Sequence, residues 1–244
     1  MVVSQMLAKP TNGSMQPEIG AVIFDMDGLM LDTEPLYKLA WQTAAEELGY
    51  PIDDRFYATL VGRPTEDCEQ ELVGQCSPGF PLDRFRVRWR NIWKAEVAEH
   101  GIQQKPGLPE FLAFLDEQRL PVAVATSSET EYTTFSLRHA GLDGYFRVIV
   151  TSNEVARGKP APDIYLEAAR RLEVVPSACV AFEDSEAGIL AATRAGMRAL
   201  LIPDWTRPSE AAVRAAFRVL DSLSEAHSLV EQLVVGRGSK HSAG

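Results

Sequence analysis

Four carboxylates and one lysine are the residues of this 244-residue chain whose types and positions are best suited to chemistry. They are Asp25, Asp27, Lys159, Glu183 and Asp184. Each pair of acids follows a short apolar run, at 21–24 and 178–182, of the kind that forms a buried strand. Charged side chains at the end of a buried strand are costly unless a ligand or partner compensates them. We therefore treat these five residues as candidates for a functional site.

The chemistry that these residues predict is phosphoryl transfer with Mg²⁺. Clustered carboxylates repel one another, and a divalent cation removes this repulsion. A set of few protein carboxylates suits Mg²⁺, which also binds substrate phosphate. The hydroxyl of Thr126 and the ammonium of Lys159 are donors suited to phosphate oxygens. One carboxylate can attack phosphorus, and a second, two residues away, can protonate the leaving oxygen and then activate water.

Alternating helix and strand patterns after residue 106 indicate how these residues are positioned. The predicted strands are 121–125, 145–150, 178–182 and 197–202, the predicted helices are 110–119, 129–139, 162–172 and 185–195, and a last helix pair follows from Arg207. With a first strand at 20–25, this alternation is typical of a doubly wound parallel sheet. Ligands of such sheets bind beyond the carboxyl ends of the strands. We therefore expect the acids, Lys159 and the run Thr126-Ser127-Ser128 to meet in one crevice.

A block near residues 32–105 contains only helical patterns, although one stretch of it fits two patterns. Its arginines alternate with apolar residues as in a half-buried strand, and they are Arg84, Arg86, Arg88 and Arg90. A longer apolar stripe has helical spacing, formed by Phe85, Trp89, Ile92, Trp93 and Val97. We interpret the stretch as an amphipathic helix whose arginines face solvent.

The predicted fold class is therefore α/β, with a doubly wound, Rossmann-like parallel-sheet core and an inserted small α-helical cap domain. The core is predicted at 18–32 and 105–235, the cap at 33–104, and tails at 1–17 and 236–244.

Composition argues against several classes of protein. A formal net charge of −10 disfavours a nucleic-acid partner, which would need clustered basic residues. No run approaches the about 20 apolar residues of a membrane span, and the N-terminus lacks a secretion signal, so we predict a cytoplasmic protein without a membrane partner. The three cysteines, Cys68, Cys76 and Cys179, are expected to be reduced thiols. A monomer is expected.

Four segments in order carry a resemblance to a known family. They are Asp25-Met26-Asp27-Gly28, Thr126, Lys159-Pro160-Ala161-Pro162-Asp163, and Glu183-Asp184-Ser185 followed by Gly188. Each is a weak signal alone, but all four at strand ends form a specific pattern. Over about residues 18–235 the chain resembles the haloacid dehalogenase superfamily, in its phosphatase and β-phosphoglucomutase-like branch. The resemblance implies a helical cap that closes over the site and excludes water.

The resemblance implies catalytic and phosphate-binding roles. Asp25 is similar to the nucleophile that becomes phosphorylated and binds the metal. Asp27 is similar to the general acid and base, whose backbone carbonyl touches the metal. Thr126, with the neighbouring Ser127, and Lys159 are similar to the phosphate-binding residues, and Lys159 also balances the charge of Asp25.

The resemblance also implies a metal site and a substrate loop. Asp184 is similar to a ligand of Mg²⁺, and Glu183 to a second ligand or an outer-shell residue. Gly62-Arg63-Pro64 matches the cap loop that reaches the substrate, so Gly62 and Arg63 are candidates for recognition. A role as a water-exposed surface residue accounts for Arg63 equally well.

Purely structural explanations exist for each segment. Asp27-Gly28 can be a turn, Lys159-Pro160 a loop, and Glu183-Asp184 a helix N-terminus. The joint occurrence of these segments favours a functional site.

Two related reactions fit the sequence less well. Dehalogenases do not need the second aspartate, so Asp27 argues against that reaction. Phosphonate cleavage through a Schiff base needs a cap lysine, and Lys38 and Lys94 lie outside the matching context.

Two alternative functions stay open. A β-phosphoglucomutase-type sugar phosphomutase is the main rival, but Tyr37 stands where that cap has a histidine, and Thr65 where it has a basic residue. A non-catalytic phosphometabolite-binding protein would usually have lost the nucleophile or the acid. We therefore predict a Mg²⁺-dependent phosphatase that hydrolyses a small phosphomonoester, a sugar phosphate or nucleotide-like metabolite, through an aspartyl-phosphate on Asp25.

Overall fold

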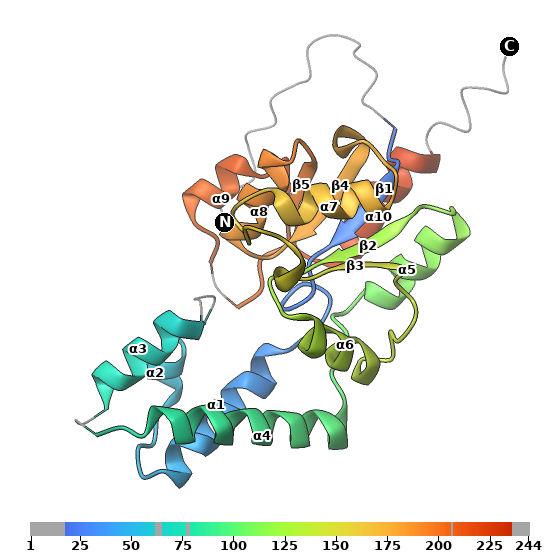
Figure 1. Ribbon diagram of the computed structural model, residues 1–244. Coiled ribbons are helices and arrows are strands. Elements are labelled where there is room, and N and C mark those ends of the chain that lie inside the picture. The colour runs from blue at the N-terminus through green and yellow to red at the C-terminus, as the bar shows by residue number, and fades with distance from the viewer. Residues whose placement is uncertain (1–17, 62–64, 77–78, 206, 236–244) are drawn as a thin grey trace, which may run out of the picture.

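The structure, a computed structural model, describes residues 18–61, 65–76, 79–205 and 207–235. Figure 1 shows a sheet with helices on its two faces, and a second group of helices, α1 to α4, at one end of this core. Among the described helices, none combines the length and the apolar character needed to cross a bilayer.

The sheet is parallel and six-stranded, in the order β3-β2-β1-β4-β5-β6. Its strands are β1 Ala21–Phe24, β2 Val122–Ala125, β3 Val148–Val150, β4 Cys179–Glu183, β5 Arg198–Leu201 and β6 Arg218–Val219. Phe24 of the central strand β1 pairs with Val124 of β2 and Phe182 of β4. This register brings the carboxyl ends of these three strands to the same edge, where the strand order also changes direction.

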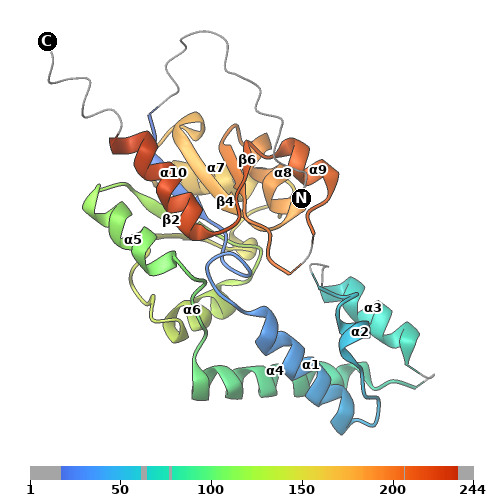
Figure 2. The same ribbon diagram turned by 180° about the vertical axis from the view of Figure 1, so that it is seen from behind.

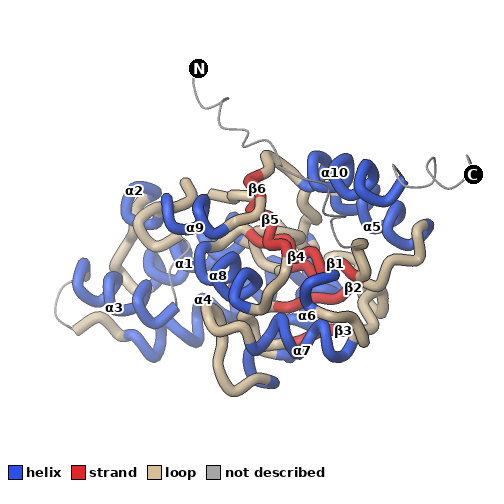
Figure 3. Tube along the Cα trace, turned by 90° about the horizontal axis from the view of Figure 1, so that it is seen from above, coloured by secondary structure: helices blue, strands red, loops and turns tan. Residues whose placement is uncertain are grey.

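Helices cover both faces of the sheet, as seen from above in Figure 3. They are α5 Leu108–Glu117, α6 Thr130–His139, α7 Asp163–Arg171, α8 Glu186–Arg194, α9 Glu210–Ala215 and α10 Leu223–Val235, with 3-10 turns at Ser152–Glu154 and Pro176–Ala178. Val22 and Phe24 belong to the core cluster on one face, where the Phe24 ring lies 5.6 Å from the ring of Phe111 of α5. Ala21 and Ile23 belong to a second core cluster on the other face, with α7 and α8. The alternation follows from the two-residue repeat of a strand that is buried on both faces.

The C-terminal end of the core differs from the sequence-based expectation. The predicted last helix pair is present as α9 and α10, but a strand that was not predicted, β6, lies between them and pairs with Leu200 and Leu201 of β5. Two residues are too few to show a hydrophobic repeat, so this strand could not be recognised from its sequence. The strand predicted at 145–150 also begins later, at Val148.

The second group of helices contains α1 Glu34–Glu47, α2 Asp54–Tyr57, α3 Thr65–Gln75 and α4 Leu82–His100 (Figure 2). Helices α1 and α4 pack closely, with the Trp41 and Phe85 rings edge to face at 5.0 Å. The five predicted stripe residues of α4 are all buried, which confirms the helical interpretation of the arginine-rich stretch. The exact domain boundaries at 33 and 104 stay a prediction.

Two connections join this group to the core, and they run side by side. Leu31 and Gln104, one on each connection, form an antiparallel bridge. The ammonium of Lys105 contacts Asp32 at 2.8 Å and Asp204 at 2.6 Å. Both connections are therefore held against the loop that follows β5.

Candidate active site

The first pair of acids lies directly beyond β1. Asp25 is 7% exposed, and its N–H donates to the Phe182 carbonyl at 3.0 Å. Asp27 is followed by Gly28, whose φ of +80° turns the chain. A Cβ on Gly28 would lie 2.5 Å from Oδ2 of Asp184, so the second pair of acids packs directly against this turn.

Lys159 joins the ends of three strands. Its buried ammonium contacts the carboxylate of Asp25, Oε1 of Glu183 at 2.5 Å and the carbonyl of Ala125 at 2.9 Å. Burial alone would lower the pKa of Lys159, but the charges of Asp25 and Glu183 raise it above its ordinary value. Lys159 is therefore a fixed positive charge beside the predicted nucleophile.

Glu183 is fully buried, and both of its carboxylate oxygens have donors. Oε1 accepts from Lys159 and from the Tyr165 hydroxyl, each at 2.5 Å. Oε2 accepts from the Ser185 hydroxyl at 3.0 Å and the Ser185 N–H at 3.4 Å. A Cβ on Gly188 would overlap this carboxylate, which explains why glycine follows the acid pair at this position. The contacts favour a positioning role for Glu183 over direct metal ligation.

Three carboxylates nevertheless form a cluster at this edge of the sheet. One oxygen each of Asp25, Glu183 and Asp184 lies within 4.8 Å of the others. Burial raises the pKa of Asp25 to about 8, against the opposing charge of Lys159, and burial also raises the pKa of Asp184 well above its ordinary value. Carboxylates with raised pKa values hold protons where a cation can bind instead, so this donor set fits a divalent metal ion.

The side chain of Asp27 faces a different partner set. Its Oδ1 accepts from the Tyr132 hydroxyl at 2.7 Å and its Oδ2 from the Ser128 hydroxyl at 2.8 Å. Burial raises the pKa of Asp27 above its ordinary value, although both hydrogen bonds oppose this shift. Because both carboxylate oxygens are held by core hydroxyl groups, only the backbone carbonyl of Asp27 is suited to a metal.

The predicted phosphate-binding residues lie in the loop after β2. Thr126 is buried, and its hydroxyl oxygen accepts from the Ser128 N–H at 3.0 Å, which leaves its proton to be donated elsewhere. Ser127 is exposed in the same loop. Gly62 and Arg63 lie outside the described residues, so their predicted substrate contacts stay predictions.

Sequence reasoning missed two residues of the site, Tyr132 and Tyr165, and it expected Ser128 in the crevice without assigning a role to it. Each acts through one hydroxyl group on a predicted acid. Ser128 was within the polar run after β2, but its partner is 101 residues away. The two tyrosines lie on α6 and α7 and carry no local signal.

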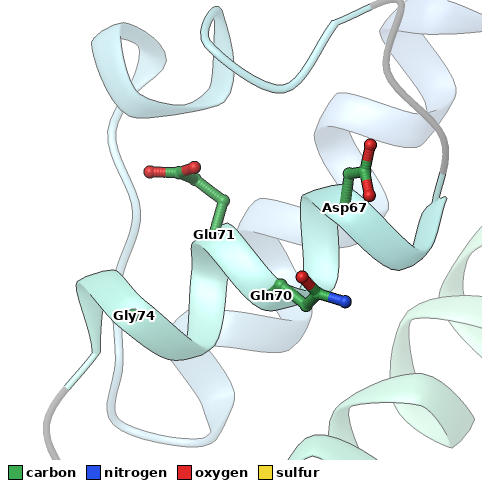
Figure 4. A pocket seen from close by; sticks show the side chains of 4 residues that line it. All are labelled: Asp67, Gln70, Glu71 and Gly74. Carbon is green, nitrogen blue, oxygen red and sulfur yellow. The ribbon is translucent and has the colours of Figure 1, made fainter.

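A separate pocket of about 250 Å³ lies on α3, lined by Asp67, Gln70, Glu71 and Gly74 (Figure 4). It contains none of the predicted site residues. The strand-end cluster is therefore the candidate active site.

A parallel sheet with strand-end acids and a buried lysine defines a hydrolase of the haloacid dehalogenase type. Comparison with known families agrees, because the family of haloacid dehalogenase-like hydrolases matches residues 22–202. The chain belongs to this family.

Named relatives support the same assignment. The phosphorylated carbohydrates phosphatase of Thermotoga maritima is 38% identical over 177 residues, which cover 72% of this chain and 82% of that protein. The β-phosphoglucomutase of Bacillus subtilis is 32% identical over 186 residues, which cover 74% and 81%. A solved structure of a HAD family hydrolase from Deinococcus radiodurans R1, with bound phosphate and sodium, has a TM-score of 0.75 and 28% identity, and covers 90% of this chain and 97% of that one.

These findings confirm the predicted family and the predicted α/β parallel-sheet fold. The predicted phosphatase activity agrees with the named activity of the Thermotoga relative. The rival sugar phosphomutase is also represented among the relatives.

Proposed function

We propose that this chain is a Mg²⁺-dependent phosphatase that hydrolyses a small phosphomonoester through an aspartyl-phosphate on Asp25. The observation that carries the proposal is the setting of Asp25. Its carboxylate contacts the buried Lys159 ammonium and lies in one cluster with Glu183 and Asp184, while Asp27 lies two residues further along the chain. The phosphorylated carbohydrates named for the Thermotoga relative support a small phosphorylated metabolite as substrate.

The metal-binding residues follow from the oxygen atoms that are still available to coordinate a metal ion. We assign the metal to the carboxylates of Asp25 and Asp184 and the backbone carbonyl of Asp27. Glu183 holds Lys159 instead, because its two oxygens already accept four hydrogen bonds. Mg²⁺ at this position supplies charge neutralisation for the phosphate oxygens.

Catalysis divides between the two aspartates. Lys159 contacts Oδ1 of Asp25, so Oδ2 is assigned to the attack on phosphorus, forming the acyl phosphate as the ester bond breaks. Asp27 gives its proton to the leaving oxygen and then takes a proton from the water that hydrolyses the intermediate. The Thr126 hydroxyl and the Lys159 ammonium bind the transferred phosphoryl oxygens.

The surroundings of Tyr37 favour water over a sugar hydroxyl as acceptor. The Tyr37 ring is stacked against Trp93 at 5.8 Å and Tyr132 at 6.2 Å. Burial raises the pKa of Tyr37 far above its ordinary value. Tyr37 therefore cannot act near neutral pH as a base that activates a sugar hydroxyl, as a phosphomutase would need at this position.

The test is release of inorganic phosphate from a panel of sugar phosphates, nucleoside monophosphates and p-nitrophenyl phosphate, with Mg²⁺ or with EDTA. We expect release only with Mg²⁺, and loss of at least about 1,000-fold in Asp25→Asn, which keeps the shape of the side chain. Activity that survives Asp25→Asn would refute the mechanism. Interconversion of hexose phosphates without phosphate release would instead identify the mutase. The cytoplasmic location, the monomeric state and the roles of Ser127, Gly62 and Arg63 stay predictions from the sequence.

A further inference from the structure

Asp204 lies in the loop after β5 and takes no part in the proposed reaction so far. Its carboxylate is held from one side, because the Lys105 ammonium contacts Oδ1 at 2.6 Å. The same ammonium contacts Oδ1 of Asp32 at 2.8 Å, and the Lys105 N–H donates to the Met30 carbonyl at 2.8 Å. The side chains of Lys105 and Asp204 are each 18% exposed. Asp204 is therefore fixed in position by a lysine that is itself anchored to the connection between β1 and α1.

The second oxygen of Asp204 lies beside the proposed metal site. A Cβ on Gly28 would lie 3.2 Å from Oδ2 of Asp204 and 2.5 Å from Oδ2 of Asp184, so both carboxylates border the same face of the Gly28 turn. Strands β4 and β5, which precede the two carboxylates, are neighbours in the sheet (Figure 3). Gly28 directly follows Asp27, whose backbone carbonyl is a proposed metal ligand.

Asp204 is nevertheless not placed to be a direct ligand together with the others. The cluster of carboxylate oxygens that lie within 4.8 Å of one another contains Asp25, Glu183 and Asp184 but not Asp204. A carboxylate just outside such a cluster can still act on a metal ion through the water molecules that the ion keeps.

A magnesium ion at this site would keep some of its water. Mg²⁺ prefers six oxygen ligands in octahedral geometry and gives up its waters reluctantly. The carboxylates of Asp25 and Asp184 and the carbonyl of Asp27 are its assigned protein ligands, and the substrate phosphate supplies a further oxygen. About two positions are then left for water, and each of these waters needs hydrogen-bond acceptors.

The other acids at this edge of the sheet have most of their oxygens occupied. Both oxygens of Glu183 already accept hydrogen bonds, and both oxygens of Asp27 accept from core hydroxyl groups. Oδ1 of Asp25 accepts from Lys159. Within the described part of the chain, the Asp204 carboxylate accepts only the hydrogen bond of Lys105 to Oδ1. Oδ2 of Asp204 is therefore available to accept from a water beside the Gly28 turn.

We infer that Asp204 is a positioning residue of the metal site, and that its Oδ2 accepts a hydrogen bond from a water molecule bound to Mg²⁺. The inference rests on the proposed phosphatase function and its metal ligands. Lys105 occupies Oδ1 and thereby holds Oδ2 toward the Gly28 turn. Loss of a hydrogen-bond partner behind the direct ligands typically weakens metal binding about 10- to 100-fold.

The substitution Asp204→Asn tests Oδ2 while it preserves the contact with Lys105. The amide oxygen can still accept from the ammonium, whereas the amide NH2 group is a donor and cannot accept from a water. The increase in Tm with MgCl2 concentration gives the Kd for Mg²⁺ without substrate or turnover. We expect this Kd to rise about tenfold or more in Asp204→Asn. The Mg²⁺ concentration that gives half-maximal phosphate release should rise by a similar factor.

Asp32→Asn is the matched control, because Asp32 is the other carboxylate that contacts the Lys105 ammonium. It removes one negative charge from the same lysine, but the Asp32 carboxylate is not among the groups that border the Gly28 turn. Its Kd for Mg²⁺ should stay within about twofold of the wild-type value, because the charge of a partly exposed side chain is screened by solvent.

Two results would overturn the inference and leave the proposed function in place. One is a Kd for Mg²⁺ that Asp204→Asn leaves unchanged. The other is equal weakening in Asp204→Asn and Asp32→Asn, which would show that both acids only hold Lys105. Absence of phosphate release from every ester of the panel by the wild-type chain with saturating Mg²⁺ overturns the proposed function itself.

Discussion

The substitution Gly188→Ala adds one methyl group where α8 passes the carboxylate of Glu183. The new Cβ would overlap that carboxylate, which is fully buried. Glu183 has no alternative position that keeps its partners, because it accepts from Lys159 and Tyr165 at 2.5 Å each and from the Ser185 hydroxyl at 3.0 Å. Either the helix or the carboxylate must therefore move.

Both movements destabilise the fold. A shift of α8 resembles overpacking, which costs about 1–3 kcal/mol. Displacement of Glu183 separates a buried ion pair with Lys159, which costs about 3–5 kcal/mol. Alanine regains only about 1 kcal/mol through its higher helix propensity. The net loss in the free energy of unfolding is therefore about 0–2 kcal/mol if α8 shifts and about 2–4 kcal/mol if Glu183 is displaced, and the larger loss would lower the Tm of a chain of this length by roughly 5–15 °C.

Urea unfolding monitored by circular dichroism measures this loss, and phosphate release measures its effect on the site. We expect release to fall about 100-fold, because Lys159 and Asp25 shift together with Glu183. The matched control is Gly74→Ala on α3, where a Cβ meets nothing within 4 Å. It should be neutral or stabilise the fold by up to about 1 kcal/mol. Equal stability of the two variants would refute the assigned packing around Glu183.

Three further predictions follow from the site and the core. Tyr132→Phe removes the hydrogen bond to Asp27 but keeps the aromatic ring. Alkyl phosphates need an acid to protonate their leaving group more than p-nitrophenyl phosphate does, so their hydrolysis should fall about tenfold more. An equal loss for both esters would contradict the role of Tyr132. Asp25 has a pKa of about 8 in the folded chain, above its value in the unfolded chain, so the metal-free fold loses stability as pH rises from about 4 to 8. Replacing EDTA with Mg²⁺ should therefore increase the Tm more at pH 8 than at pH 5.5. An equal increase at the two pH values would contradict the raised pKa of Asp25. Burial raises the pKa of Cys179 to about 11, so only about one thiol in a thousand is ionised at pH 8. Mass spectrometry should find Cys179 unmodified by iodoacetamide in the native chain but modified in urea. Rapid modification of the native chain would contradict the burial of this thiol.

Much of the core could be predicted because its signals are local. The buried strands β1 and β4 are short apolar runs that end at charged residues, and α4 has an apolar stripe with a helical repeat. The rule that parallel strands end at one edge then placed Asp25 near Asp184. Strand β6 was missed because its two residues are both exposed and show no pattern.

Long-range hydrogen bonds had no such signal. The Tyr132 hydroxyl reaches Asp27 across 105 residues, and no local spacing distinguishes it from any other helical tyrosine. The same holds for Tyr165 and Glu183, whose contact makes the glutamate a positioning residue. The resemblance left open whether Glu183 is a metal ligand or an outer-shell residue, and the contacts favour the second because both of its oxygens already accept hydrogen bonds.

By itself, the sequence determined the class of chemistry and the edge of the sheet where it takes place, because strand periodicity and the order of the acids are properties of short segments. Only the tertiary structure decided which oxygen of each acid has a partner, and which aromatic rings from α4 and α6 meet beside Asp27. These choices depend on side chains that are brought together by packing between distant elements, and the free energy of such contacts is not encoded in any local pattern.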